Sequence, residues 1–106
     1  MFTAIREYRM TAGSVDDLMH KVDVGIADVF ADQEGFLRYE VLDAGDGRLV
    51  SITTFTDRAS AQNSNELASD FVREELAEFG LARTASQMGE VMVSRAGSSL
   101  LEPVHH

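Results

Sequence analysis

The stretch GFLRYEVLDAGDGRLVSITTF, residues 35–55, decides the fold. It contains two strand-like runs, at 36–42 and 49–55, and the second run is rich in the Val, Ile and Thr residues that favour strands. The segment DAGDG between them, residues 43–47, supplies the Asp and Gly residues that hairpin turns need. We therefore predict an antiparallel pair of strands in the middle of the chain.

An amphipathic helix pattern lies on each side of this hairpin. Ser14 fits an N-cap, and apolar residues recur at helical spacing from position 15 to about position 31. The second pattern follows the N-cap candidate Asp57 and stops at Gly80. Within it we expect an irregular stretch around 60–65, where polar residues that do not favour helix formation stand in a row.

Strand-like alternation at both ends of the chain, at 2–10 and 87–95, completes the pattern. The order strand-helix-strand-strand-helix-strand predicts an α+β, ferredoxin-like fold, in which a four-stranded antiparallel sheet carries two helices on one face. The 106 residues suffice for one domain, so we assign 1–96 to a single domain and 97–106 to a C-terminal tail. The tail ends in LEPVHH, which looks like the remnant of an expression tag, and we leave His105 and His106 out of the functional argument.

The composition excludes several classes of function. Eighteen acidic against nine basic residues give a net charge of −9, which repels phosphate backbones and anionic membrane surfaces. The absence of cysteine excludes disulfides, thiolate nucleophiles and Cys-type zinc sites. No apolar run approaches the roughly 20 residues of a membrane span. We therefore expect a cytoplasmic protein with no nucleic-acid or membrane partner.

Strand alternation assigns the side chains to the two faces of the sheet. One set is almost wholly apolar, and we expect it under the helices: Ile5, Leu37, Tyr39, Val41, Val50, Ile52, Val91 and Val93. The other face mixes Phe, Tyr, Leu and Met with Arg and Glu, which is too apolar for a face in contact with solvent. We therefore predict a homodimer in which a second copy covers this face and two sheets close a dimeric α+β barrel. Its expected interface residues are Arg6, Tyr8, Arg38, Glu40, Phe55, Glu90 and Met92.

A ligand pocket is expected between the sheet and the helices. Tyr39 is either a core tyrosine with a satisfied hydroxyl or a ligand anchor and acid. Asn63 and Asn65 either belong to a solvated first turn or polarise a substrate oxygen. With Phe71 these residues form the predicted pocket, and Tyr39, Asn63 and Asn65 are the candidate catalytic residues. A pocket below roughly 100 Å³ would count against small-molecule catalysis.

We predict no metal site. His20 is the only histidine outside the C-terminal tail and is most simply a surface residue, although its pKa range would suit proton transfer. No His₃ or His–carboxylate set is present. Residues 43–47 faintly resemble a calcium loop, but its twelfth position is Thr54 in place of the required glutamate, so a hairpin turn is the better interpretation.

Two short segments carry a family resemblance. The strand opening Gly35-Phe36-Leu37-Arg38-Tyr39 and the helix entry FTDRASA, residues 55–61, together with the element order, resemble the antibiotic-biosynthesis-monooxygenase-like family over about 2–95. The resemblance implies a dimeric ferredoxin-like barrel whose pocket admits polyketide quinols, quinones or haem, and in which oxygen is often used without a bound cofactor. Many members have Trp where Phe55 stands and histidines early in the second helix, where 62–65 read QNSN.

Two functions remain open at this point. The resemblance implies a cofactor-independent monooxygenase-like enzyme acting on a small aromatic or quinone-type substrate. The missing Trp and His favour the alternative, a non-catalytic dimeric module that binds a small apolar ligand or a protein. The sequence leaves open whether the chain is an enzyme, and it predicts no cofactor.

Overall fold

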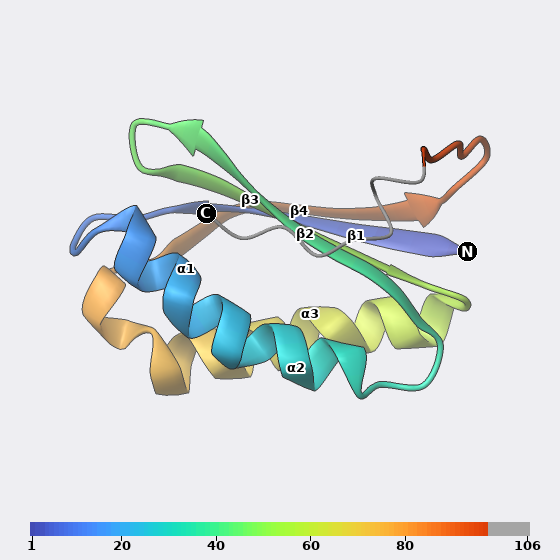
Figure 1. Ribbon diagram of the computed structural model, residues 1–106, viewed down its shortest axis with the longest axis horizontal. Coiled ribbons are helices and arrows are strands. Elements are labelled where there is room, and N and C mark those ends of the chain that lie inside the picture. Colours follow the sequence, from blue (N-terminus) through green and yellow to red (C-terminus); the bar gives the residue numbers. More distant parts are fainter. Residues whose placement is uncertain (98–106) are drawn as a thin grey trace.

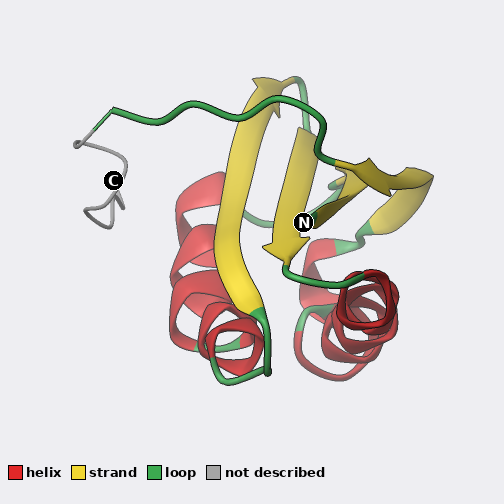
Figure 2. Ribbon diagram, turned by 90° about the vertical axis from the view of Figure 1, so that its right-hand side faces the viewer, coloured by secondary structure: helices red, strands yellow, loops and turns green. Residues whose placement is uncertain are grey.

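The computed structural model describes residues 1–97, so most of the predicted tail, including His105 and His106, lies outside the described residues. The elements in chain order are β1 (Phe2–Arg9), α1 (Val15–Val24), α2 (Ile26–Ala31), β2 (Phe36–Gly45), β3 (Arg48–Phe55), α3 (Arg58–Glu75), the 3₁₀ helix η1 (Ala77–Phe79) and β4 (Ala82–Glu90). The strands form one antiparallel sheet in the order β2-β3-β1-β4. The helices form a layer against one face of this sheet (Figures 1 and 2). The predicted ferredoxin-like α+β fold is confirmed.

Both helical segments begin at the predicted N-caps. The Ser14 hydroxyl accepts a hydrogen bond from the backbone N–H of Asp17 at 3.1 Å. The Asp57 carboxylate accepts one from the backbone N–H of Ser60 at 2.8 Å, and this bond is the main reason that the pKa of Asp57 is lowered. Each cap satisfies a backbone donor that the first helical turn leaves without a partner.

The second helix is regular where irregularity was expected. The stretch 60–65 belongs to the continuous helix α3, so that expectation is wrong. Here the Ser64 hydroxyl is buried and donates to the carbonyl of Ala61 at 2.6 Å, so a polar side chain is accommodated without interrupting the helix. Gly80 ends η1 in the left-handed region, with φ of 57°, as its predicted role as a helix stop requires.

The first helical segment is divided in two, and not continuous as predicted. Gly25 has φ −117° and ψ −93°, which breaks the helix between α1 and α2. The side chain of Phe71 on α3 lies against this break, at a distance that leaves no room for a Cβ. The absent side chain thus allows α3 to pack closely against the α1–α2 junction.

The fourth strand lies at Ala82–Glu90, and the predicted position 87–95 is wrong. Among the strands of residues 1–97 its only partner is β1, and Phe2 of β1 already pairs with Glu90. The backbone N–H of Val91 donates to the carbonyl of Met1 at 2.9 Å, so β1 offers no further partners beyond this point. The length of the neighbouring strand, and not the local residue pattern, therefore sets the end of β4.

The face of the sheet that meets the helices differs from the prediction in β1 and β3. Its buried members are Ala4, Arg6 and Tyr8 of β1 and Leu49, Ser51, Thr53 and Phe55 of β3. The expected Ile5, Val50 and Ile52 lie on the outer face and are half-buried. Polar residues thus occupy the helix-covered side in the middle of the sheet, and apolar residues the outer side.

The register of the β2–β3 hairpin explains this error. Tyr39 pairs with Thr53, whereas Ile52 pairs with Glu40. Directly opposed residues share a face, so Tyr39 and Ile52 cannot lie on the same side as predicted. The prediction holds for Tyr39 and Val41, which pack against the core, but it fails for Leu37, which is 50% exposed beside a register shift. Val91 and Val93 lie beyond the end of β4.

A single apolar core fills the space between sheet and helices. Its buried members are Leu18, Val22, Ile26, Phe30, Leu49, Ala68, Leu76 and Phe79. Most of them come from the helices, because Leu49 is the only strand residue among them. Within residues 1–97, no helix has both the length and the apolarity needed to cross a membrane.

Replacing Gly25 by alanine should destabilise the protein, although alanine is ordinarily better in a helix by about 1 kcal/mol. A Cβ at this position would lie 2.5 Å from Cζ of Phe71 and 2.8 Å from the carbonyl oxygen of Lys21. We expect overpacking to lower the free energy of unfolding by about 1–3 kcal/mol, measured by urea denaturation. Gly89→Ala is the control, because a Cβ there meets nothing within 4 Å. Equal stability of the two variants would contradict this account of the helix break.

Candidate functional site

The guanidinium of Arg6 is the centre of the site. It projects from β1 to the helix-covered side of the sheet and has no exposed surface. Nη1 donates to Ser64 Oγ at 3.2 Å and to Asn65 Oδ1 at 2.9 Å, so it reaches α3. Nη2 donates to Ser51 Oγ at 3.0 Å and to Thr53 Oγ1 at 3.2 Å, both on the adjacent strand β3. Four neutral acceptors thus hold one buried cation.

No carboxylate within residues 1–97 forms an ion pair with Arg6. Its Nε is buried and lacks a hydrogen-bond partner among the described residues, and the guanidinium carbon lies 5.6 Å from the ring centre of Phe30. Burial lowers the pKa of Arg6, whereas the phenols of Tyr8 and Tyr39 oppose that change. An arginine remains protonated at neutral pH, so an uncompensated positive charge lies inside the protein. Such a charge is costly unless something anionic offsets it.

Tyr39 lies beside this cation and packs edge-on against Phe30, with ring centres 4.9 Å apart. Burial raises the pKa of its phenol to about 12, although Ser51 and Arg6 act in the opposite direction. Tyr39 is therefore neutral at physiological pH. It can donate a hydrogen bond, but it is a poor acid or base.

A small cavity opens between the sheet and the helices at this point. Its volume is about 40 Å³, and its walls are mostly apolar. The lining residues that matter here are Tyr8, Phe30, Tyr39, Ser51, Phe71 and Val72. This volume lies below the roughly 100 Å³ set above as the lower limit for small-molecule catalysis, so the cavity by itself is too small for an aromatic substrate. It is large enough for a molecule of the size of water.

A larger hollow adjoins the cavity and shares Tyr8, Val72, Leu76 and Leu81 with it. Its volume is about 390 Å³, which lies within the usual range of ligand sites. The hollow is bounded by the C-terminal half of α3, by η1 and by the start of β4. The two spaces together therefore offer a large outer chamber and a small apolar inner one.

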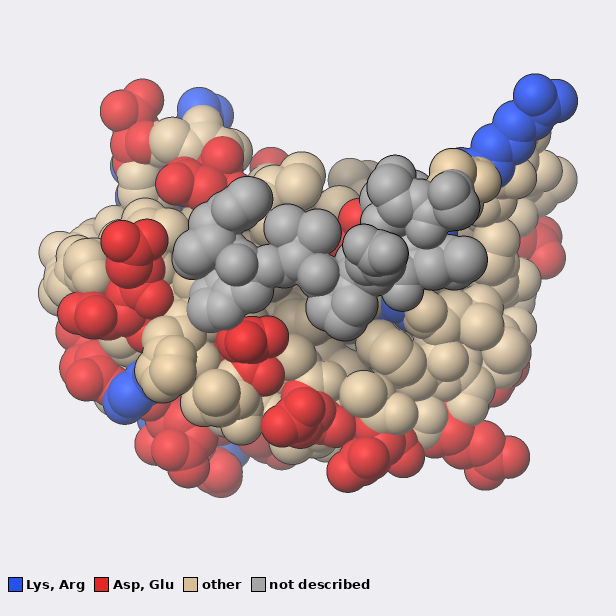
Figure 3. All heavy atoms as spheres, in the orientation of Figure 1, with Lys and Arg blue, Asp and Glu red and all other residues tan. Residues whose placement is uncertain are grey.

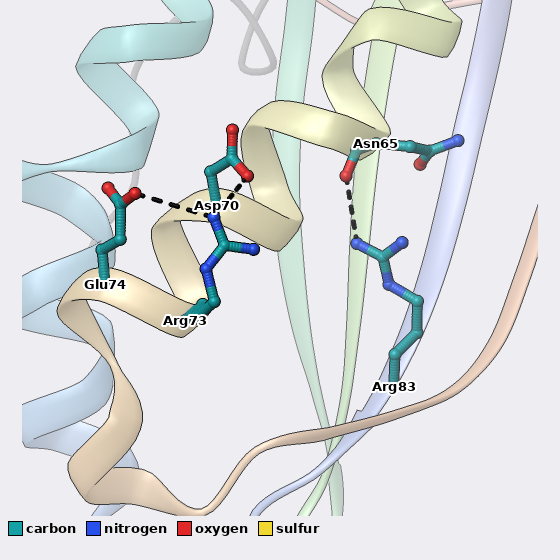
Figure 4. A network of polar contacts seen from close by, with 5 residues as sticks. All are labelled: Asn65, Asp70, Arg73, Glu74 and Arg83. Atoms are coloured by element: carbon teal, nitrogen blue, oxygen red, sulfur yellow. Dashed lines mark hydrogen bonds and ion pairs between the residues drawn. The ribbon is translucent and has the colours of Figure 1, made fainter.

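Arg83 of β4 stands at this hollow. Its Nη2 donates to the Tyr8 hydroxyl at 2.9 Å and to the backbone carbonyl of Asn65 at 3.3 Å. Its guanidinium carbon also lies 5.5 Å from the ring centre of Tyr8. Figure 4 shows Arg83 extending from its strand towards α3. Tyr8 therefore separates two cationic groups, Arg6 on its inner side and Arg83 at the hollow.

The structure brings together only some of the predicted pocket residues. Tyr39 and Phe71 line the inner cavity, and the amide of Asn65 binds Arg6. Asn63 is exposed on α3 and lines neither the cavity nor the hollow. Two residues along a helix differ by about 200° in direction, which is why Asn63 and Asn65 do not share a face.

The predicted interface residues divide into two groups. Arg6, Tyr8 and Phe55 are buried under the helices, so their assignment to the outer face is wrong. Arg38 and Glu40 do lie on the outer face, opposite Thr54 and Ile52, and remain interface candidates. The last two, Glu90 and Met92, are exposed at and beyond the end of β4, and their interface role also stays a prediction.

Sequence reasoning missed the burial of Arg6 and its acceptors under the helices. A signal was present, because Ser51 and Thr53 occur at alternate positions of their strand and Arg6 lies on the neighbouring strand. This face was assigned instead to the interface with a second copy. Arg83 was missed because β4 was placed too far along the chain.

We predict that ionisation of Tyr39 lowers the free energy of unfolding as the pH rises in the alkaline range. The phenol in the unfolded chain, with pKa about 10, loses its proton before the folded one, whose pKa is about 12. The contribution of this phenol to the free energy of unfolding is complete below about pH 10 and should be lost as the pH rises from about 10 to about 12. Urea denaturation across this pH range should show a smaller loss of stability for Tyr39→Phe than for the wild type. Near-ultraviolet titration of wild type minus Tyr39→Phe should give a midpoint near 12, and a midpoint near 10 would contradict the assigned burial.

Comparison with known proteins places this geometry in a family. No curated protein matches the chain significantly. SnoaB, a cofactor-independent oxygenase from Streptomyces nogalater, is 21% identical with a TM-score of 0.58, over 90% of this chain and 94% of SnoaB. The ActVA-Orf6 monooxygenase of Streptomyces coelicolor, solved with nanaomycin D, is 13% identical with a TM-score of 0.63, over 92% of each chain. A dimeric ferredoxin-like protein from an uncultured marine organism is 12% identical with a TM-score of 0.65, over 92% of this chain and all 100% of that one.

At these identities the solved structures demonstrate a shared fold. The sequence model of one family, described as antibiotic biosynthesis monooxygenase, matches residues 1–74, which cover β1 to most of α3 and include Arg6, Tyr39 and Asn65. The chain therefore belongs to the antibiotic biosynthesis monooxygenase family.

Proposed function

We propose that the protein is a cofactor-independent monooxygenase that acts on a small aromatic or quinol-type substrate in the space between sheet and helices. The observation that carries the proposal is the buried Arg6 guanidinium, which has no carboxylate partner within residues 1–97 and contacts two residues that line the apolar cavity, Ser51 and Phe30. Membership of the family and the fold shared with SnoaB support the reaction type.

Arg6 suits the chemistry that such a reaction needs. A phenolic substrate that loses its hydroxyl proton to solvent water becomes an electron-rich oxyanion, from which dioxygen can accept electrons. One oxygen atom then forms a bond to a substrate carbon, and the other leaves as water. A nearby guanidinium in a site of low dielectric stabilises that oxyanion and lowers the pKa of the hydroxyl. Four hydrogen bonds already hold Arg6 in place, so little reorganisation is required when the charge develops. Tyr39, neutral at physiological pH, would orient the substrate as a hydrogen-bond donor.

The two adjoining spaces suit the two reactants. The outer hollow of about 390 Å³ has room for an aromatic ring system, and the inner cavity of about 40 Å³ has room for a diatomic molecule. Dioxygen is apolar, and the walls of the inner cavity are mostly apolar. The substrate would then lie with its reacting edge at Tyr8 and Leu81, which line both spaces.

Loss of the Arg6 charge should abolish most of the activity. With a panel of quinols and flavonoid-like phenols, we expect Arg6→Gln to reduce oxygen uptake by about 10²-fold or more, because the positive charge that stabilises the oxyanion is lost. Tyr39→Phe should reduce oxygen uptake less, because it leaves the Arg6 cation in place. Arg9→Gln, which removes an exposed charge from the same strand, is the control and should retain full uptake. Circular dichroism verifies that each variant is folded.

Other results would separate the enzyme from a binding module. Thermal stabilisation of the wild type by a panel compound without oxygen uptake would favour the non-catalytic alternative. Uptake that survives in a folded Arg6→Gln variant would contradict the role of the buried cation. Absence of both uptake and stabilisation across the panel would count against a small-molecule site of this class.

We also propose that the outer face of the sheet is a homodimer interface. The half-buried Ile5, Val50 and Ile52 lie there, joined by Leu42, which is 50% exposed. An apolar stripe across the centre of a sheet is unfavourable in water and is typical of an interface. Arg38 and Glu40 flank the stripe and would set the orientation of a second copy.

A charge placed in the stripe should prevent dimerisation. We expect light scattering to give a dimer for the wild type at micromolar concentration and a monomer for Ile52→Glu, because an unpaired carboxylate would be buried at the interface. Val24→Glu introduces the same charge on the helix side, where Val24 is 59% exposed, and should remain dimeric. A monomeric wild type would overturn the proposed dimer.

A further inference from the structure

Arg83 has features of a ligand anchor that the oxygenase proposal does not use. It lies at the outer hollow and has no carboxylate partner within residues 1–97. Its two hydrogen bonds both use Nη2, so Nη1 and Nε donate to no described residue. The side chain is nevertheless held in one orientation by the Tyr8 hydroxyl and ring and by the Asn65 carbonyl. A fixed guanidinium with free donors is suited to bind an anion through a charge-assisted hydrogen bond.

Arg73 of α3 also lines the hollow and illustrates the difference. It forms ion pairs with Asp70 at 2.9 Å and with Glu74 at 3.7 Å, and Figure 4 shows both carboxylates turned towards it. Its charge is thus already neutralised by its own helix. Arg83, in contrast, donates to the carbonyl of Asn65, as Figure 4 shows, and to the Tyr8 hydroxyl, both of which are neutral.

The buried Arg6 strengthens the positive potential at the hollow. β1 places Arg6 and Tyr8 on the same face of the sheet, two residues apart, so Tyr8 lies between the two guanidiniums. The unpartnered Nε of the fully buried Arg6 adds a second cation without an anion. These two groups lie on either side of Tyr8 in a chain with a net charge of −9, whose acidic side chains dominate the helix edge of the face drawn in Figure 3. The site therefore attracts an anion that the rest of the surface repels.

We infer that the hollow binds an aromatic carboxylate, and that Arg83 donates a hydrogen bond to the carboxylate group. Val72, Leu76 and Leu81 supply the apolar wall against which the aromatic ring would lie. These three residues also line the inner cavity, so the two spaces adjoin at this wall. A monoanion suits the site better than a phosphate dianion, because the strongly acidic surface opposes a second negative charge. The inference rests on the proposed function for the identity of the site, but it concerns binding and needs no turnover.

Calorimetric titration under nitrogen tests the inference with naphthalene-2-carboxylate and its methyl ester. Wild type should bind the carboxylate more tightly than the ester by about tenfold or more, as a charge-assisted hydrogen bond implies. Arg83→Gln should remove this preference and leave ester binding unchanged, and Arg83→Lys should restore only part of it, because lysine carries the charge without the fixed orientation of the guanidinium. Arg58→Gln removes an exposed charge at the start of α3, away from the hollow, and is the control that should retain the preference.

Three results would overturn the inference: equal affinity of wild type for the acid and the ester, no binding of either, or the same loss in Arg58→Gln as in Arg83→Gln. The measurement is independent of the oxygenase proposal, because oxygen is excluded. Carboxylate preference without oxygen uptake in air would contradict only the proposed reaction. Uptake that is equally fast with neutral and acidic substrates would contradict only the carboxylate site.

Discussion

The burial of one guanidinium is the constraint on which the rest of the structure depends. Arg6 needs acceptors for its donors, and it finds them in Ser51 and Thr53 on one side and in Ser64 and Asn65 on the other. The first pair requires β1 and β3 to present these residues to the helices, and the second requires α3 to lie over the centre of the sheet. The hydroxyls of Thr53 and Ser64 are themselves 3.0 Å apart. A single polar network thus determines both the strand faces and the position of the helix.

Burying a cation among neutral acceptors is not expected to favour folding. Removing a cation from water costs more than neutral hydroxyl and amide acceptors return, and an apolar residue of similar volume is often as good or better for folding. The ring of Phe30 and the acidic surface of the molecule offset part of that cost. The remaining cost has a physical rationale if the site receives an anionic ligand or an oxyanion that forms during a reaction. Local departures from good packing are expected at functional sites.

Local signals were sufficient to predict the fold. Ser14 and Asp57 start helices, Gly80 stops one, and 43–47 forms a turn, because each depends on the chemistry of a few neighbouring residues. The end of β4 was not predictable in this way, since it depends on where β1, its partner strand, begins. The break at Gly25 was missed for a similar reason, because Phe71 comes from a different helix. The errors therefore concern contacts between distant segments.

The candidate site was only partly predictable because the hydrophobic pattern of the sheet is inverted at its centre. Alternation normally places isoleucine inside and arginine outside, but here Ile5 and Ile52 lie on the outer face and Arg6 lies within. Tyr39 was placed correctly because β2 follows the ordinary rule. An inverted pattern is physically coherent only if the outer apolar stripe is covered and the inner polar centre meets a polar partner. The same inversion therefore supports both the proposed second copy on one face and the proposed anionic ligand on the other.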